Sequence, residues 1–223
     1  MNITLPVISF NVIGPEIILS LAVMAMMLLN ALARGGARSS MPYLSLAAIV
    51  AAIGYCLSLW GASEEAFNRM VVLDSYSLFF KILFLLTTGL TILMSIRYLK
   101  EEGFDYGEYY MLLLLATVGM MLMAAAADLI IVFLGLETFS ISLYILAGLF
   151  RNQPKSAEAS LKYFLLGAFS SGFLLYGIAL IYGATGTTNL AGLYQVLGWE
   201  MLTVNPLLSV GMGLLIVGFG FKI

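Results

Sequence analysis

The sequence predicts an all-α, polytopic bundle of about seven transmembrane helices. Of its 223 residues, 62% are hydrophobic and only 10% are charged, whereas about a quarter of the residues in a soluble domain are charged. The apolar residues gather into seven segments, each near the ~20 residues that an α-helix needs to cross a bilayer. Lysine and arginine are concentrated in alternate connections between these segments, as in a multi-pass membrane protein.

Each apolar segment is expected to form one membrane span. The fourth and fifth segments are joined only by Ala127 and Asp128, which predicts a tight turn outside the membrane, because one continuous helix of about 42 residues would be far longer than a span. The seven segments are Pro15–Ala33, Tyr43–Trp60, Tyr76–Tyr98, Tyr109–Ala126, Leu129–Phe150, Ala157–Tyr182 and Pro206 to the last residue.

The distribution of basic residues predicts the orientation. Three alternate loops carry the pairs Arg34 and Arg38, Arg97 and Lys100, and Arg151 and Lys155, whereas the other side carries Arg69 alone. Because basic residues stay on the inner side of the membrane, the N-terminus is expected outside.

The composition excludes several kinds of cofactor site within this chain. Cys56 is the only cysteine and there is no histidine, which excludes a cysteine-ligated iron–sulfur cluster, a covalently attached haem and a histidine-based zinc site. We therefore expect no cofactor in this chain, and Cys56 is interpreted as a small packing residue. There is no basic tract, so the sequence also argues against nucleic acid binding.

Glu137 is the first candidate functional residue. It lies about nine residues into the fifth segment, so its carboxyl group is expected roughly 13 Å deep in the membrane. An acidic residue at that depth costs about 2.5–3.5 kcal/mol on insertion scales, so it calls for a partner or a function. The alternative is a neutral buried acid bonded to Ser140 or Ser142.

Lys222 and Lys162 are the other two candidates. Lys222 follows Gly211, Gly213, Gly218 and Gly220, which permit close packing or a helix break, and it is read either as a buried functional lysine or as one that reaches the inner surface. Lys162 follows Glu158 by one helical turn, so a structural ion pair and a role in proton transfer remain open.

Further polar positions receive structural interpretations. The small residues Gly167, Ala168, Ser170, Ser171 and Gly172 are expected to form a helix-packing face. Lys81 is expected to reach outward or to pair with Asp74, and Asp128 to lie in the outer turn. Glu16 suits the electrostatics of a helix N-terminus.

Three runs of sequence resemble a known family. The run Phe133-Leu-Gly-Leu-Glu137-Thr-Phe-Ser-Ile-Ser-Leu-Tyr-Ile-Leu-Ala-Gly148 resembles the fifth helix of the antiporter-like subunits of respiratory complex I. The run from Ser156 to Gly183 resembles the subunit N branch of that family, and Val217-Gly-Phe-Gly-Phe-Lys222 resembles its seventh-helix lysine motif. The resemblance covers essentially the whole chain.

The resemblance implies a proton-translocating role. It implies that Glu137 pairs with Lys222 and that Lys162 matches a sixth-helix lysine of subunit N, in a fold of about fourteen spans with two inverted five-helix repeats. Residues 1–108 would hold the three leading helices and residues 109–223 an incomplete first repeat. Because the last segment ends abruptly, we expect an N-terminal portion of a longer protein, with a natural seven-span protein as the alternative.

The resemblance also implies partners and a location. This chain would lie in the inner membrane of a bacterial cell as a subunit of an NADH:quinone oxidoreductase, beside other membrane-arm subunits, with NAD, FMN, iron–sulfur clusters and quinone held by partner subunits. Three alternatives stay open: a subunit of a multisubunit cation/proton antiporter, a subunit of a related hydrogenase or ferredoxin-linked complex, and a non-pumping membrane scaffold.

Overall fold

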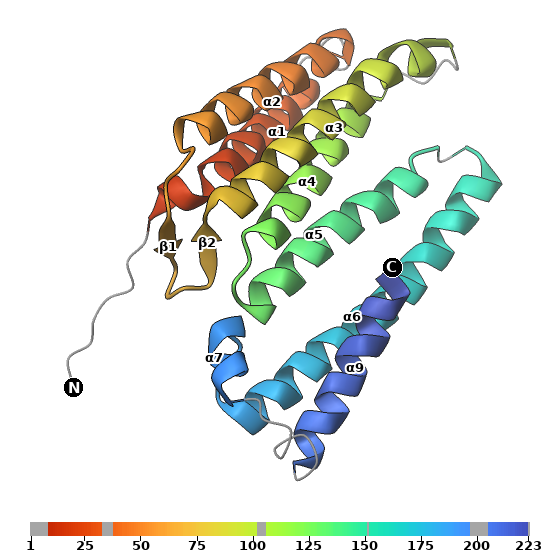
Figure 1. Cartoon of the computed structure of the whole chain (residues 1–223). Helices are drawn as coiled ribbons and strands as arrows, with labels where there is room; N and C mark the ends of the chain where they lie inside the picture. The colour runs from red at the N-terminus through yellow and green to blue at the C-terminus, as the bar shows by residue number, and fades with distance from the viewer. Residues whose placement is uncertain (1–8, 33–37, 102–105, 151, 197–204, 223) are drawn as a thin grey trace.

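The fold is a bundle of long helices with one small β-hairpin (Figure 1). The computed structural model describes residues 9–32, 38–101, 106–150, 152–196 and 205–222. The elements are η1 (Phe10–Ile13), α1 (Gly14–Leu32), η2 (Arg38–Ser40), α2 (Met41–Ser58), β1 (Glu64–Ala66), β2 (Val71–Leu73), α3 (Ser75–Glu101), α4 (Gly107–Ala124), α5 (Leu129–Ala147), α6 (Pro154–Thr185), α7 (Leu190–Val196) and α9 (Pro206–Lys222).

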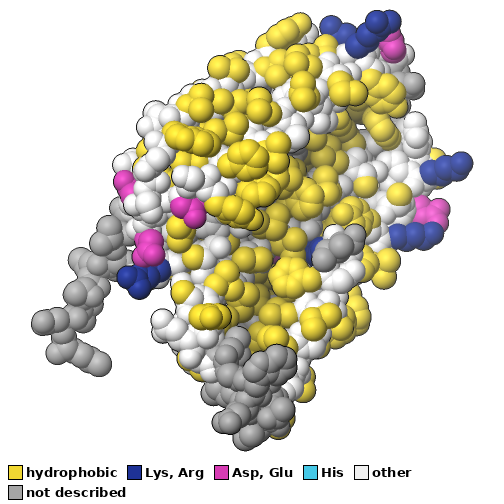
Figure 2. Space-filling view, viewed as in Figure 1, with side chains coloured by type: hydrophobic (Ala, Val, Ile, Leu, Met, Phe, Trp, Pro, Cys, Tyr) yellow, Lys and Arg dark blue, Asp and Glu magenta, His cyan; other side chains and the backbone are white. Residues whose placement is uncertain are grey.

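The predicted all-α membrane fold is confirmed. Six of the described helices are long and apolar enough to cross a membrane, and α9 is a shorter apolar helix. Each expected segment corresponds to one helix. Helix α7 and the hairpin of β1 and β2 were not predicted from the sequence. In Figure 2, hydrophobic side chains cover the middle of the visible face and charged side chains lie toward its margins.

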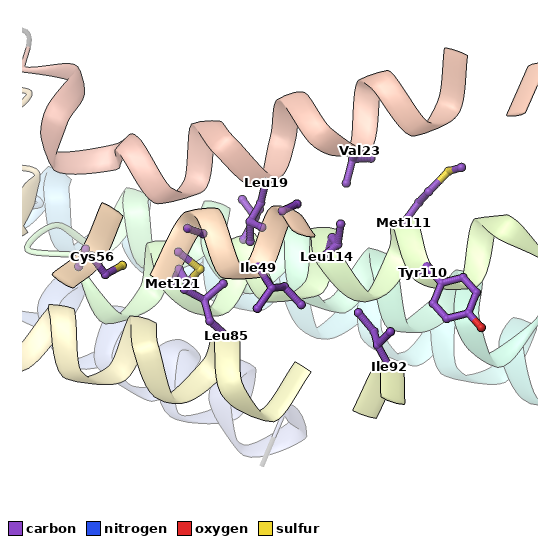
Figure 3. Packing of buried hydrophobic residues seen from close by; sticks show 14 of the residues in the cluster. Leu19, Val23, Ile49, Cys56, Leu85, Ile92, Tyr110, Met111, Leu114 and Met121 are labelled. Atoms are coloured by element: carbon purple, nitrogen blue, oxygen red, sulfur yellow. The ribbon is translucent and has the colours of Figure 1, made fainter. Parts of the chain in front are cut away.

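The helices form two packed groups. Helices α1 to α4 surround one apolar core, in which Leu19 of α1, Ile49 of α2 and Leu85 of α3 meet Leu114 of α4 (Figure 3). Cys56 belongs to this core and is fully buried, so its interpretation as a packing residue is confirmed. Helix α5 packs along α4, and α6 packs against both α5 and α9 around a second, smaller apolar cluster.

The contact between α4 and α5 depends on two glycines. A Cβ atom at Gly119 would lie 2.5 Å from the backbone nitrogen of Phe139 and 2.6 Å from the carbonyl oxygen of Gly135. The two backbones therefore touch, as helices in membranes do where small residues face each other. The predicted tight turn between these helices is confirmed, since α4 ends at Ala124 and α5 begins at Leu129.

Backbone hydrogen bonds tie three turns together at one end of the bundle, which we call the hairpin end. The amide of Val72 in β2 donates to the carbonyl of Ala125 at 2.8 Å, and the amide of Ala127 donates to the carbonyl of Met70 at 2.9 Å. The amide of Leu190, at the start of α7, in turn donates to the carbonyl of Ala127 at 2.9 Å. The α4–α5 turn is thus held between the hairpin and the α6–α7 turn.

Asp128 has a larger role in this turn than the sequence indicated. It is the N-cap of α5 and its side chain accepts a hydrogen bond from the amide of Ile130 at 2.8 Å, which satisfies a helix-terminal donor. Its second oxygen accepts a hydrogen bond from the hydroxyl of Thr188 at 2.7 Å, and only 3% of the residue is exposed. It is therefore a buried link between two turns.

The expectation for Lys81 was wrong. Its Nζ lies 2.8 Å from a carboxylate oxygen of Glu16 and donates to the carbonyl of Val12 at 3.0 Å, with both charged side chains nearly inaccessible. The reason is helical geometry, because Lys81 shares the buried face of α3 with Leu78 and Leu85. Asp74, the expected partner, instead accepts a hydrogen bond from the amide of Ser77 at 2.7 Å and caps α3.

We expect Lys81→Met to destabilise the protein by about 3–5 kcal/mol, because it leaves the Glu16 carboxylate buried without a counter-charge. The double variant Glu16→Gln with Lys81→Met should recover much of that loss, since neither charge remains. The free energies of unfolding of both variants in detergent micelles provide the test. Equal losses in the single and double variants would contradict this account.

We expect Gly119→Ala to destabilise the protein by about 1–3 kcal/mol, because the new methyl group meets backbone atoms that cannot move aside. Gly54→Ala is the matched control, since a Cβ atom at Gly54 meets nothing within 4 Å. Midpoints of thermal unfolding of the two variants should therefore differ, with the Gly54 variant close to the wild type.

Candidate functional site

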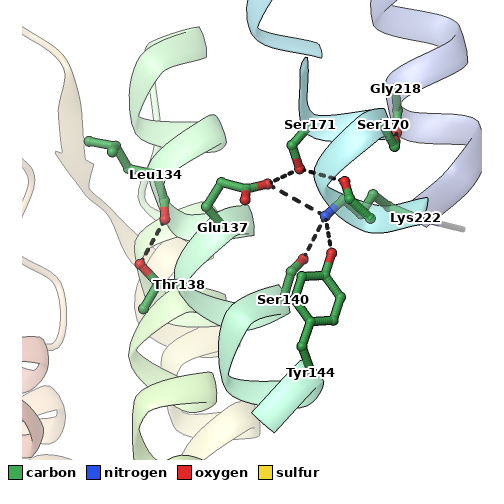
Figure 4. Close-up of polar contacts among 10 residues, drawn as sticks. Leu134, Glu137, Thr138, Ser140, Tyr144, Ser170, Ser171, Gly218 and Lys222 are labelled. Atoms are coloured by element: carbon green, nitrogen blue, oxygen red, sulfur yellow. Dashed lines mark hydrogen bonds and ion pairs between the residues drawn. The ribbon is translucent and has the colours of Figure 1, made fainter. Parts of the chain in front are cut away.

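The candidate site lies where α5, α6 and α9 meet (Figure 4). Glu137 comes from the middle of α5, and Lys222 from the last turn of α9. The Nζ atom of Lys222 lies 3.5 Å from Oε1 of Glu137, and the two side chains are 8% and 20% exposed, respectively. Two of the three candidate residues are therefore in contact.

Three hydroxyl groups complete this contact. Lys222 Nζ donates to the hydroxyl oxygens of Ser140 and Tyr144, each at 2.9 Å. The hydroxyl of Ser171 donates to Oε1 of Glu137 at 2.5 Å. Ser140 is thus a partner of the lysine rather than of the acid, and Ser142 bonds to the backbone carbonyl of Thr138 at 2.8 Å. In the alternative interpretation of Glu137 as a neutral acid, the hydroxyl partner was Ser140 or Ser142; the structure shows Ser171 as that partner instead.

Sequence reasoning missed Tyr144 and Ser171. Tyr144 follows Glu137 by seven residues, two turns along the same helix, and this spacing could have placed it on the same face of α5. Nothing in the sequence alone pairs Ser171 with Glu137, because they lie on different helices and 34 residues apart.

Small residues of α6 allow α5 to approach. A Cβ atom at Gly167 would lie 1.9 Å from the Tyr144 hydroxyl, so only glycine leaves room for that hydroxyl. Gly167, Ser170 and Ser171 are buried, as the predicted packing face requires. Ala168 and Gly172 are exposed and do not belong to it.

Glycines also bring α9 close to α6. A Cβ atom at Gly177 would lie 2.9 Å from the carbonyl oxygen of Gly211, and one at Gly218 would lie 2.8 Å from Cβ of Leu174. The hydroxyl of Ser170 donates to the carbonyl oxygen of Gly218 at 2.9 Å, one turn before Lys222. This close contact sets the position from which Lys222 reaches α5.

Lys162 is not part of this constellation. It forms the expected ion pair with Glu158 one turn earlier in α6, and the two side chains are 70% and 63% exposed. The helical pairing is confirmed, while its role in proton transfer stays a prediction.

The site is chemically suited to hold a proton. A buried ammonium needs hydrogen-bond acceptors and a negative charge, and here one carboxylate and two hydroxyl oxygens supply them. At an effective dielectric constant near 20, unit charges about 4 Å apart interact by about 4 kcal/mol. Within the residues that the structure describes, no group of three or more histidine, cysteine, aspartate or glutamate side chains could hold a metal ion.

Known proteins are similar to this chain in sequence and in fold. The family described as "NADH:quinone oxidoreductase/Mrp antiporter, TM" matches residues 126–223. A curated relative from Trichlorobacter lovleyi, named NADH-quinone oxidoreductase subunit N, is 50% identical over 216 residues, 97% of this chain and 44% of the relative. Another from Roseiflexus castenholzii, named NADH-quinone oxidoreductase subunit N 2, is 46% identical over 183 residues, 81% of this chain and 37% of the relative.

Solved structures agree with these relatives. A chain of respiratory complex I from Thermus thermophilus with bound aureothin superposes with a TM-score of 0.73 at 33% identity, covering 93% of this chain and 43% of that one. A chain of the Mrp complex from Dietzia sp. DQ12-45-1b superposes with a TM-score of 0.67 at 23% identity, covering 94% of this chain and 24% of that one, and shows likeness of fold alone.

These matches define a class of multi-pass membrane protein, the antiporter-like subunits shared by NADH:quinone oxidoreductases and Mrp antiporters. Within that class, the chain belongs to the subunit N family of NADH-quinone oxidoreductases. It spans less than half the length of the curated relatives that it matches, 44% and 37% for the two named above.

Proposed function

We propose that this chain is the N-terminal part of a proton-translocating membrane subunit of a bacterial NADH–quinone oxidoreductase, which couples quinone reduction to proton pumping. The observation that carries the proposal is the contact between Glu137 and Lys222, two oppositely charged groups from different helices inside an apolar bundle. Such charges in a membrane are costly and mark proton or ion pathways.

The proposed mechanism is electrostatic. A proton on Lys222 is favoured while the ionised carboxylate of Glu137 is near, and it is released when the two groups separate. The attraction between the two unit charges, about 4 kcal/mol at an effective dielectric constant near 20, is lost when they separate. Lysine has a long and flexible side chain. A small movement of α9 or α5, or a rotation of the Lys222 side chain, is therefore enough to separate the two charged groups.

Lys162 has a secondary place in this proposal. Its pair with Glu158 lies on the surface of the bundle near the start of α6, and not in the buried cluster around Lys222. A lysine in that position suits delivery of protons toward the buried pair, and its loss should be less damaging.

If the chain is a subunit of this oxidoreductase complex, its arrangement in repeats, its neighbours and the location of the cofactors follow. Residues 1–108 are proposed to be the leading helices, and residues 109–223 part of one antiporter-like repeat. NAD, FMN, iron–sulfur clusters and quinone are proposed to be bound by partner subunits, and other membrane-arm subunits and lipid are the proposed neighbours in the inner membrane. The basic loops described above support a prediction that the hairpin end faces outward.

The antiporter alternative makes a different demand on the partners. A subunit of a cation/proton antiporter would purify without the flavin and iron–sulfur subunits of an NADH oxidoreductase. Copurification of those subunits with the full-length protein distinguishes the two.

We expect Glu137→Gln and Lys222→Met, each in the parent complex, to reduce proton translocation at least ten-fold, because either change removes one charge of the buried pair. Lys162→Met should reduce it less, since its pair is exposed. Proton uptake and quinone reduction are measured together in proteoliposomes, at matched assembly.

Glu65→Gln, at an exposed acidic residue of the hairpin, is the control and should pump as the wild type does. Normal pumping by the Glu137 variant would favour a non-pumping scaffold. Equal losses for Glu137→Gln and Lys162→Met would contradict the ranking.

A further inference from the structure

The Lys222 ammonium lies closer to two hydroxyl groups than to its carboxylate partner. Its Nζ is 2.9 Å from the oxygens of Ser140 and Tyr144, and 3.5 Å from Oε1 of Glu137. We infer that Tyr144, together with Ser140, forms a second station for the Lys222 ammonium, which holds the lysine when it parts from Glu137. This inference rests on the proposed function of the pair and makes Tyr144 a positioning residue.

The two stations lie along one face of α5. Ser140 and Tyr144 follow Glu137 by three and seven residues. The three residues therefore lie on one face of α5, over about 10 Å of helix. The direction from Glu137 to Tyr144 leads away from the hairpin end, because α5 begins beside that end.

The Tyr144 side chain is held rigidly enough to serve as a fixed acceptor. It is 4% exposed, and its ring packs edge-on against Tyr163 with centroids 4.6 Å apart and against Phe164 with centroids 6.0 Å apart. Its hydroxyl fills the space that a side chain at Gly167 would occupy. A moving lysine thus meets a hydroxyl whose position is set by α6.

The hydroxyl station resolves a difficulty of the electrostatic mechanism. If Lys222 left Glu137 for an apolar surface, the ammonium would lose every acceptor and the step would be costly. Because Ser140 and Tyr144 already accept hydrogen bonds from Nζ while Glu137 is near, a lysine that loses its charged partner keeps two neutral ones and remains hydrogen-bonded. A neutral acceptor attracts the ammonium less than a carboxylate does, so the proton is held more weakly there.

The station should be visible in the pH dependence of pumping. Among the described residues, the titratable groups that face the ammonium are Glu137 and Tyr144 of α5, with Tyr163 of α6 behind the Tyr144 ring; α6 otherwise presents the hydroxyls of Ser170 and Ser171. An acceptor favours the charged form of the lysine. Its removal should require a higher proton concentration to load the site.

The test compares Tyr144→Phe with wild type in proteoliposomes of the parent complex between pH 6 and pH 9. We expect the alkaline limb of the pumping rate to move by about one pH unit toward acid, the scale of one hydrogen bond to a charged group. Tyr176→Phe is the matched control, since that residue is 61% exposed on α6, and it should leave the profile in place.

A second pair of variants tests whether the position of the Tyr144 hydroxyl matters when the hydroxyl itself is kept. Gly167→Ala should displace the Tyr144 hydroxyl and shift the profile in the same direction, whereas Gly172→Ala should not, because a Cβ atom there meets nothing within 4 Å. An unchanged profile for both Tyr144→Phe and Gly167→Ala overturns the inference, as does a rate lowered equally at every pH. If Glu137→Gln also pumps normally, the proposed function fails too; if it does not pump, only the second station fails.

Discussion

The structure depends on one constraint, the cost of burying charged groups in the apolar interior of the bundle. A charge there requires an opposite charge beside it, and hydrogen-bonding groups lower its cost further. Two pairs meet this requirement, Glu16 with Lys81 and Glu137 with Lys222. They differ in their surroundings. The first is sealed in the core of α1 to α4, where the Lys81 ammonium lies 2.8 Å from the Glu16 carboxylate and, among the described residues, no group donates a hydrogen bond to either carboxylate oxygen. The second is partly exposed and ringed by hydroxyls, which suits a pair that opens.

Small residues decide which helices can bring such groups together. Backbones touch between α4 and α5 at Gly119, and between α6 and α9 at Gly177 and Gly211. In a membrane, lipid gives little hydrophobic drive for helices to associate, so van der Waals contact between close backbones contributes much of the packing. Two of the glycines in α9, Gly211 and Gly218, bring this helix close to α6, whereas a Cβ atom at Gly213 or Gly220 would meet nothing within 4 Å. Helix α9 continues through all four glycines to Lys222.

The fold was predictable from composition and segment length, while the partners of buried polar groups were only partly so. The apolar segments corresponded to helices, since a bilayer admits little else for such sequences. The charges of Glu137 and Lys222 were identifiable because they interrupt apolar runs. The partner of Lys81 was not identifiable from the sequence, because it depends on how α1 crosses α3. The role of Tyr144 was likewise hidden, since its hydroxyl acts only where Gly167 leaves room. Both outcomes reflect contacts between helices, which local sequence patterns do not encode.

The backbone hydrogen bonds at the hairpin end affect which substitutions this sequence can accept during evolution. They run from main-chain amides to main-chain carbonyls, at Val72, Ala127 and Leu190. Almost any side chain is compatible with these three bonds, so their positions can change in sequence and keep them, whereas the bond between Asp128 and Thr188 needs both of its side chains. Proline is the exception, because it has no amide hydrogen to donate. The connection between the leading helices and the charged site is therefore robust to mutation in a way that the site itself, built from individual side chains, is not.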